Sequence, residues 1–253
     1  MDRREEIAAN LAAVRARIAA ACTAAQRKPD EITLVAVTKT YPAADVLHLA
    51  ALGVRDVGEN RDQEAAPKAA EVRATGGEVT WHFVGQLQRN KARSVASYAD
   101  VVHSVDRSSL AAALAQAARR VRDRPLDVLI QVNLDPGAAG AAGEPGDSGA
   151  AGLVSDPQHR GGALPGTVAE IAAAIAAEDG LRLRGLMAVA PIEGDPGAAF
   201  ARLAGVAKAL RADHPKATVV SAGMSGDLEQ AIAHGATHVR IGSALLGKRA
   251  LLG

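Results

Sequence analysis

Lys39 ends the most apolar short run of the chain, at a position where its amine could do chemistry. The run from Leu34 to Thr38 has the length and β-branched content of a buried parallel strand, and Pro42 can open the helix that follows. Closed α/β folds bind ligands at the carboxyl ends of such strands, and an amine held there can form a Schiff base with an aldehyde. A solvated lysine at a strand end is the commoner outcome for a lysine taken alone.

Two turns rich in glycine and serine predict a phosphate site. One follows an apolar run at 217–221 and contains Ser225, and the other follows a run at 237–241 and contains Gly242 and Ser243. Loops after the seventh and eighth strands of a barrel often bind phosphate, together with the N-terminus of a following helix. Either serine alone is more simply explained as a helix cap. Two such turns in consecutive units favour phosphate binding.

Arg240 lies in the last of these runs among apolar neighbours, so its guanidinium must find partners inside the protein. A structural salt bridge is one explanation. A ligand contact is favoured because Gly242 follows so closely. A phosphorylated aldehyde would suit a pocket of this kind. The lysine amine would lie on one side, and the arginine and the predicted phosphate site on the other. Pyridoxal 5′-phosphate (PLP) is a cofactor of that kind.

Eight alternations of a short apolar run with an alanine-rich helical stretch must position these residues. They predict a closed (β/α)8 TIM barrel preceded by an extra N-terminal helix at 3–26. An open doubly wound sheet is the alternative, but no G-x-G-x-x-G motif follows the first strand. The expected strands are 32–38, 54–58, 80–84, 100–105, 126–133, 181–189, 217–221 and 237–241, and the expected helices are 42–52, 60–74, 89–98, 107–123, 165–178, 196–213, 225–234 and 243–250.

The barrel would occupy residues 1–253 as a single domain, with one interruption. Residues 135–163 are dominated by Gly, Ala, Pro and Ser, which cannot bury enough apolar surface to offset the entropy lost on ordering. We expect a flexible insertion there. A functional lid is the alternative, because the segment leaves the ligand face of the barrel.

Composition narrows the classes of partner. Aromatic residues are 2% of the chain and the formal charge is +1, so neither base stacking nor a global field supports a nucleic-acid partner. Cys22, the single cysteine, predicts no internal disulfide, and no Cys/His spacing predicts a metal site. The charged N-terminus is unlike a signal segment, and no run approaches the ~20 apolar residues of a membrane span. We therefore expect a cytoplasmic protein with no membrane partner.

Seven motifs lie along residues 30–248, outside the insertion: VAVTKTYP, VGENRDQE, WHFVGQLQRNK, HSVDR, LIQVN, LRGLMAVAP and SAGMSGDLEQAIAHGATHVRIGSALLG. Together they resemble the pyridoxal phosphate homeostasis proteins, the YggS/PROSC family. The resemblance implies a single alanine-racemase-like barrel of PLP fold type III. It also implies covalent PLP binding and a role in vitamin B6 and amino-acid homeostasis, without an established catalytic reaction.

The resemblance also implies a role for individual residues. Lys39 matches the lysine that forms the Schiff base with PLP. Ser225, Gly242 and Ser243 match positions expected to hold the phosphate. Ser243 stands where threonine is common, a change that keeps the hydroxyl and the N–H. This sequence departs from the family where the Gly/Ala insertion replaces a short charged loop.

Arg240 matches an arginine that faces the pyridine nitrogen in related racemase barrels, and Asn60 and His82 match positions near the cofactor. A guanidinium is purely a hydrogen-bond donor, so it favours an unprotonated pyridine nitrogen and weakens the ring as an electron sink. This suits a carrier better than a transaminase. The expected partners are PLP and PLP-dependent apoenzymes, and the expected state is a monomer.

Two enzymatic alternatives remain. An amino-acid racemase of low activity would need a second base opposite the lysine, commonly a tyrosine from a further domain. The tyrosines of this chain are Tyr41 and Tyr98, and neither lies in a C-terminal segment. A Schiff-base aldolase also uses a barrel lysine and a phosphate site. Lys91 is equally well explained as a second lysine of the mouth or as a solvated charge. Surface or packing roles are expected for His103, His214, His234 and His238.

Overall fold

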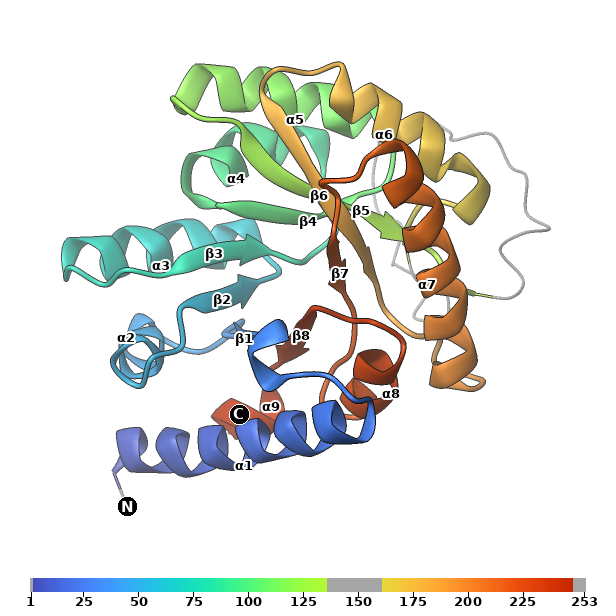
Figure 1. The fold of residues 1–253 in the computed structure, drawn as a ribbon. Coiled ribbons are helices and arrows are strands. Elements are labelled where there is room, and N and C mark those ends of the chain that lie inside the picture. Colours follow the sequence, from blue (N-terminus) through green and yellow to red (C-terminus); the bar gives the residue numbers. More distant parts are fainter. Residues whose placement is uncertain (1, 136–160, 248–253) are drawn as a thin grey trace.

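The computed structural model describes residues 2–135 and 161–247, which form a closed barrel of eight parallel strands surrounded by helices (Figure 1). The strands follow one another around the barrel in chain order, and β1 closes it by pairing with β8. The predicted TIM barrel is confirmed. The strands are β1 (Thr33–Val37), β2 (Asp56–Glu59), β3 (Thr80–Phe83), β4 (Val101–Val105), β5 (Leu126–Val132), β6 (Leu181–Ala188), β7 (Val219–Ser221) and β8 (His238–Ile241).

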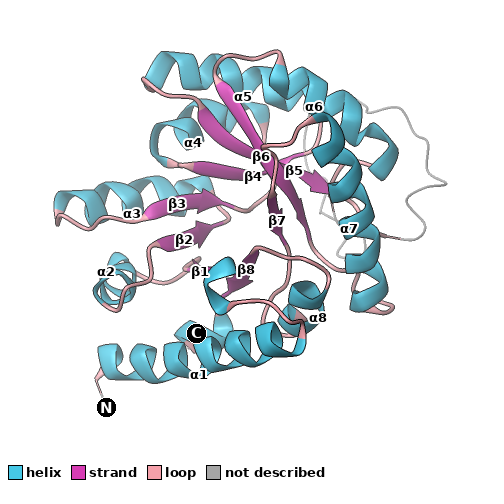
Figure 2. Ribbon diagram, viewed as in Figure 1, coloured by secondary structure: helices cyan, strands magenta, loops and turns pink. Residues whose placement is uncertain are grey.

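The strands are largely buried because helices cover their outer side and the barrel interior encloses the other (Figure 2). In β5 every residue except Asp127 is buried. The register sets Val35 of β1 beside both Asp56 of β2 and Arg240 of β8. Since all pairs are parallel, the carboxyl ends of the strands gather at one mouth of the barrel.

The helices follow the strands as expected, with small shifts. Two of them start later because the 3-10 turns Arg89–Lys91 and Pro165–Thr167 precede them. Residues 248–250, the end of the last predicted helix, lie outside the described residues. The helices are α1 (Arg3–Ala24), α2 (Ala43–Ala51), α3 (Asp62–Ala74), α4 (Ala92–Tyr98), α5 (Ser108–Val121), α6 (Val168–Ala176), α7 (Pro196–Asp213), α8 (Leu228–Ala233) and α9 (Ser243–Leu246).

The extra N-terminal helix, α1, is part of the globular core. It begins with a capping box, in which the Asp2 side chain accepts from the Glu5 backbone and the Glu5 side chain accepts from the Asp2 backbone. By length and mean hydropathy alone, α1 could cross a membrane, contrary to the expectation from sequence. A single helix of this kind near the N-terminus is weak evidence for a membrane span, because a buried core helix passes the same test. The residues that it buries against the barrel, beside α8 and α9, include Ile7, Leu11, Val14 and Ile18.

Arg3 fastens α1 to the rim of the mouth. Its guanidinium lies 2.6 Å from a carboxylate oxygen of Asp45 in α2 and donates to the carbonyl oxygen of Leu246 in α9. It also lies over the ring of Tyr41, 5.6 Å from the centroid. The hydrogen bond with Asp45 raises the pKa of Arg3 above its ordinary value, so this side chain is a permanent charge.

The predicted insertion at 135–163 falls almost wholly outside the described residues. Its last part does not: Ala163 pairs in parallel with Val132, and the Gln131 side chain donates to the carbonyl oxygen of Gly161. Residues 161–163, which the prediction included in the insertion, thus run along the end of β5.

Candidate functional site

The mouth of the barrel gathers five of the residues singled out from the sequence. Lys39 comes two residues after β1 and Asn60 directly after β2, Ser225 lies in the loop after β7, and Gly242 and Ser243 follow β8. The neighbouring strands β8, β1 and β2 bring three of these loops together. Close packing ties β8 to β1, because a Cβ added to Gly242 would lie 3.4 Å from the carbonyl oxygen of Val37.

Lys39 is half-buried, and its amine has no hydrogen bond or ion pair within residues 2–135 and 161–247. The backbone around it has an unusual shape. Thr40 adopts a φ of +68°, a left-handed conformation that is rare for a β-branched residue, and its N–H donates to Glu64. An amine without a partner, on a backbone of defined shape, is available to a ligand in the mouth.

Thr38 is held on every side by groups that are themselves buried. Its N–H donates to the Gly58 carbonyl, its hydroxyl donates to Glu59 Oε1 at 2.6 Å, and its carbonyl accepts from Lys68 Nζ at 2.8 Å. Lys68 and Glu59 form an ion pair of 2.6 Å with side-chain exposures of only 8% and 1%. This ion pair therefore fixes the residue that directly precedes Lys39.

Two acceptor oxygens at the end of β2 are buried and receive no hydrogen bond from the part of the chain that the structure describes: Oε2 of Glu59 and Oδ1 of Asn60. A buried acceptor without a donor is unfavourable, so such a group in a folded protein calls for an explanation. The loop packs tightly here, since a Cβ added to Gly85 would lie 2.1 Å from the Asn60 carbonyl oxygen. A ligand that carries a hydroxyl or N–H group would supply the donor that Asn60 lacks.

The Ser225 turn differs from the sequence expectation. The following helix α8 starts at Leu228, so Ser225 lies in a turn and does not cap the helix. Arg17 of α1 donates to the Ser225 carbonyl, and Asp227 accepts from the N–H of Met224. The Ser225 backbone is thereby anchored while its side chain stays partly exposed. Ser243, by contrast, is the first residue of α9 and is exposed.

Arg240 is buried, with 5% of its surface exposed, and it points across the barrel toward β6 and β7. One guanidinium nitrogen donates to Ser221 Oγ at 2.7 Å, and the other donates to the carbonyl oxygen of Ala188 at 2.8 Å. Both of these acceptors are neutral, and together they fix the orientation of the guanidinium. A fixed cation near the carboxyl ends of β6 and β7 suits an electron-rich group of a ligand.

His82 lies inside the barrel, where its ring bonds to Asp56 at 2.9 Å and to His103 at 2.8 Å. Of the surface or packing role expected for His103, burial excludes the surface alternative, and the ring also makes hydrogen bonds. His103 is fully buried and also bonds to Ser221 Oγ at 3.0 Å. Burial lowers the pKa of His103 well below its ordinary value, so the ring is neutral. Burial likewise lowers the pKa of His238 to about 4.

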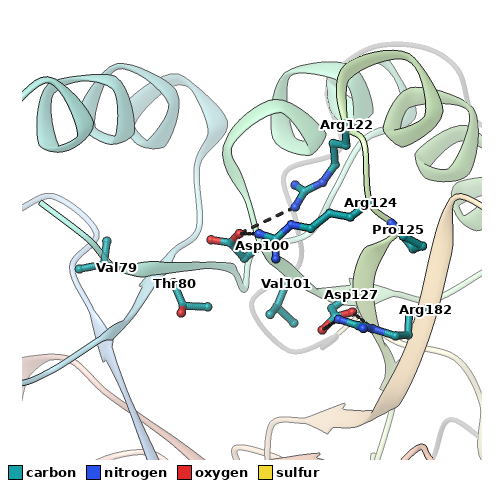
Figure 3. Close-up of a pocket in the computed structure, with 9 residues that line it drawn as sticks. All are labelled: Val79, Thr80, Asp100, Val101, Arg122, Arg124, Pro125, Asp127 and Arg182. Atoms are coloured by element: carbon teal, nitrogen blue, oxygen red, sulfur yellow. Dashed lines mark hydrogen bonds and ion pairs between the residues drawn. The ribbon is translucent and has the colours of Figure 1, made fainter. Parts of the chain in front are cut away.

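A surface pocket of about 310 Å³ lies at the opposite end of the barrel, around the starts of β3 to β6 (Figure 3). Its charged side chains largely neutralise one another. Arg124 lies 2.6 Å from Asp100, and Arg182 lies 2.5 Å from Asp127. The residues singled out from sequence do not line this pocket, so it is separate from the candidate site.

Comparison with known proteins identifies the family of this chain. The model of the alanine racemase N-terminal domain matches residues 9–250. A pyridoxal phosphate homeostasis protein of Mycobacterium tuberculosis (strain ATCC 25618 / H37Rv) is 44% identical over 264 residues, which cover 99% of this chain and 95% of the relative. The chain belongs to the pyridoxal phosphate homeostasis protein family.

Solved structures agree with this family. PipY of Synechococcus elongatus PCC7942, solved with PLP bound, has a TM-score of 0.76 at 32% identity, and the match covers 95% of this chain and 100% of PipY. An alanine racemase of Corynebacterium glutamicum has a TM-score of 0.61 at 16% identity, with 98% of this chain and 62% of the racemase covered. At that identity the racemase shows only a shared barrel fold.

Sequence reasoning did not find the role of three polar residues in this member of the pyridoxal phosphate homeostasis protein family: Asp56, His103 and Ser221. Each lies in a strand of the barrel, and each bonds to another polar residue in the interior. A signal was present, because a polar residue inside an apolar strand must find a partner. The argument was applied to Arg240 alone.

Proposed function

We propose that this protein binds PLP covalently through Lys39 and serves PLP homeostasis. The observation that carries the proposal is the amine of Lys39 at the barrel mouth, which has no hydrogen-bond or ion-pair partner among the described residues and lies on a backbone held by buried groups. Relatives with this name and the PLP-bound PipY structure support it. In the proposed step, the Lys39 amine condenses with the aldehyde to form a Schiff base and one water leaves.

The residues of the mouth fit the cofactor. Ser225, Gly242 and Ser243 would hold the phosphate through hydroxyl and backbone N–H groups, and the small size of Gly242 allows close approach. Asn60 would accept from a donor of the ligand, which accounts for its buried oxygen without a partner. PLP when bound supplies an aldehyde and an aromatic ring that can act as an electron sink.

Arg240 would limit what the cofactor can do. As a pure donor, it would face the ring nitrogen and keep that nitrogen unprotonated, which weakens carbanion stabilisation. The tyrosines offer no obvious second base for racemisation. The Tyr41 hydroxyl donates to the Gly247 carbonyl at 2.7 Å, and Tyr98 is buried, which raises its pKa above the ordinary value. Holding PLP therefore fits these residues better than racemisation does.

The deciding experiment is borohydride reduction of the PLP-loaded protein followed by peptide mass spectrometry. We expect a pyridoxyl adduct on Lys39 and its loss in Lys39→Ala. Lys91→Ala is the matched control. Lys91 also follows a barrel strand, β3, but its ammonium already lies 4.0 Å from the carboxylate of Asp62. An adduct on another residue would refute the site. A protein that stays colourless with added PLP would refute PLP binding and favour the aldolase alternative.

The cellular setting is part of the same proposal. We place the protein in the cytoplasm as a monomer that exchanges PLP with PLP-dependent apoenzymes. The buried free thiol of Cys22 is compatible with a reducing compartment. Fractionation of cells tests the location, and sedimentation of the PLP-loaded protein tests the monomer. Loss of PLP to a purified apoenzyme, followed by its gain of activity, tests the exchange.

A further inference from the structure

Five polar side chains from five strands form a continuous hydrogen-bonded chain through the barrel interior. Asp56 of β2 lies 2.9 Å from His82 Nε2, and His82 Nδ1 lies 2.8 Å from His103 Nε2. His103 Nδ1 lies 3.0 Å from Ser221 Oγ, which accepts from Arg240 at 2.7 Å. His82, His103, Ser221 and Arg240 are all buried, whereas Asp56 is 27% exposed. The chain thus leads from the amino end of β2 to the arginine near the mouth.

The chemistry of its two ends sets the direction of every hydrogen bond in the chain. Arg240 can only donate, so Ser221 Oγ accepts from it and turns its own proton toward His103 Nδ1. At the other end an ionised Asp56 can only accept, so His82 carries its proton on Nε2 and accepts on Nδ1. His103 must then donate from Nε2. With both rings neutral, all four bonds are satisfied only when each ring is protonated on Nε2.

The surroundings of His103 favour its neutral state. The titratable and charged groups that act on His103 are His82, Arg240 and His238, and the ring of His238 lies 6.3 Å from that of His82. The charge of Arg240 opposes a further positive charge inside the barrel. Burial acts in the same direction and lowers the pKa of His103.

We propose that Asp56, His82, His103 and Ser221 are positioning residues for PLP binding, because their one-directional chain holds the guanidinium of Arg240 in the orientation that meets the cofactor ring. This inference rests on the proposed function. When Ser221 donates its proton to His103, the lone pairs of its hydroxyl are turned toward Arg240. Asp56 in turn sets the proton positions on the two histidine rings, although it lies at the amino end of β2, away from the mouth. Its charge therefore acts on the cofactor site through three intervening side chains.

The first test needs no cofactor. Nitrogen-15 NMR of the histidine rings in the PLP-free protein, near neutral pH, distinguishes the two neutral tautomers and the cation. We expect His82 and His103 to be neutral and protonated on Nε2, and Asp56→Asn to introduce the other tautomer, since an amide can donate as well as accept. A ring protonated on Nδ1, or a charged ring, in the unsubstituted protein would overturn the proposal.

The second test measures PLP binding in Ser221→Ala and Asp56→Asn. We expect PLP affinity to fall about threefold to tenfold, the effect of one misdirected hydrogen bond, together with a shifted absorption band of the bound cofactor. Ser221→Thr keeps the hydroxyl and should restore both. Asp123→Asn is the control and should match the unsubstituted protein, because Asp123 is an exposed carboxylate three residues before β5.

The two proposals fail in different ways. If the unsubstituted protein does not bind PLP, the proposed function is wrong and the positioning role falls with it. If it binds PLP while Ser221→Ala and Asp56→Asn fold and leave affinity and spectrum unchanged, only the positioning role is refuted. Circular dichroism shows whether each variant folds. If either variant fails to fold, the histidine tautomers that NMR finds in the unsubstituted protein decide whether the proposal holds.

Discussion

The ammonium of Lys68 lies 2.6 Å from the carboxylate of Glu59 inside the protein, and both side chains also bond to Thr38. A buried pair of this kind is weak evidence for stability, because removing two charges from water offsets much of their attraction. Its position suggests another use. The pair determines the shape of the backbone next to Lys39 and thereby presents the amine to the mouth.

Loss of one partner of this pair should be severe. Lys68→Met leaves the Glu59 carboxylate buried without a cation, and we expect the free energy of unfolding to fall by about 3–5 kcal/mol. The double variant Lys68→Met, Glu59→Gln removes the unpaired charge and should recover part of that loss. Urea denaturation measures both. The control is Arg61→Met, since Arg61 pairs with Glu64 at the surface and should change stability by less than about 1 kcal/mol. Equal effects of the two single variants would contradict the prediction.

Asn60 should matter for binding more than for folding. Its Oδ1 has no donor in the described part of the chain, so Asn60→Ala removes an unsatisfied acceptor and should change stability by no more than about 1 kcal/mol. PLP affinity should fall roughly tenfold if the ligand supplies that donor. Thermal denaturation and a PLP titration measure the two effects. A variant that is much less stable yet binds PLP normally would show that Asn60 has a structural role.

Stability should decrease as the solution becomes more acidic. Burial lowers the pKa of His238 to about 4 from an ordinary value of 6.5, so between these values the unfolded chain binds a proton that the folded protein excludes. The free energy of unfolding then falls by about 1.4 kcal/mol for each pH unit from 6.5 down to about 4, and it is fully retained above 6.5. His103 acts in the same direction.

The variant His238→Gln isolates this contribution. Urea denaturation near pH 7 and near pH 5 should show a shallower pH dependence in His238→Gln than in the unsubstituted protein, by about 1.4 kcal/mol per pH unit. His214→Gln, at the carboxyl end of α7, is the control for removing a histidine. An unchanged slope in His238→Gln would mean that His238 titrates normally in the folded protein.

The attachment of α1 should depend on Asp45. Its side chain is buried and holds Arg3, so Asp45→Ala leaves the guanidinium without its carboxylate partner. We expect a loss of about 1–3 kcal/mol and faster hydrogen exchange in the first turns of α1. Glu6→Ala removes a more exposed partner of the same arginine and should have a smaller effect. Hydrogen exchange that is unchanged in α1 would show that apolar packing alone holds the helix.

The sequence by itself determined the barrel and which residues stand at its mouth. Apolar runs of strand length alternate with helical stretches, and in a parallel barrel every loop that follows a strand opens at the same end. Lys39, Asn60, Ser225, Gly242 and Ser243 could therefore be assigned to the mouth from their positions after strands. The start of α8 was placed too early because the signals that mark helix ends are short and local.

Only the tertiary structure decided which buried polar groups meet. Lys68 reaches Glu59 and Thr38 from the neighbouring helix, and His103 reaches Ser221 across 118 positions of sequence. These contacts depend on the register between strands and on the way the barrel closes, and neither is encoded in the local pattern of the chain. A polar residue in an apolar strand predicts that a hydrogen-bond partner lies nearby in the folded protein. Which partner it finds is a property of the closed barrel.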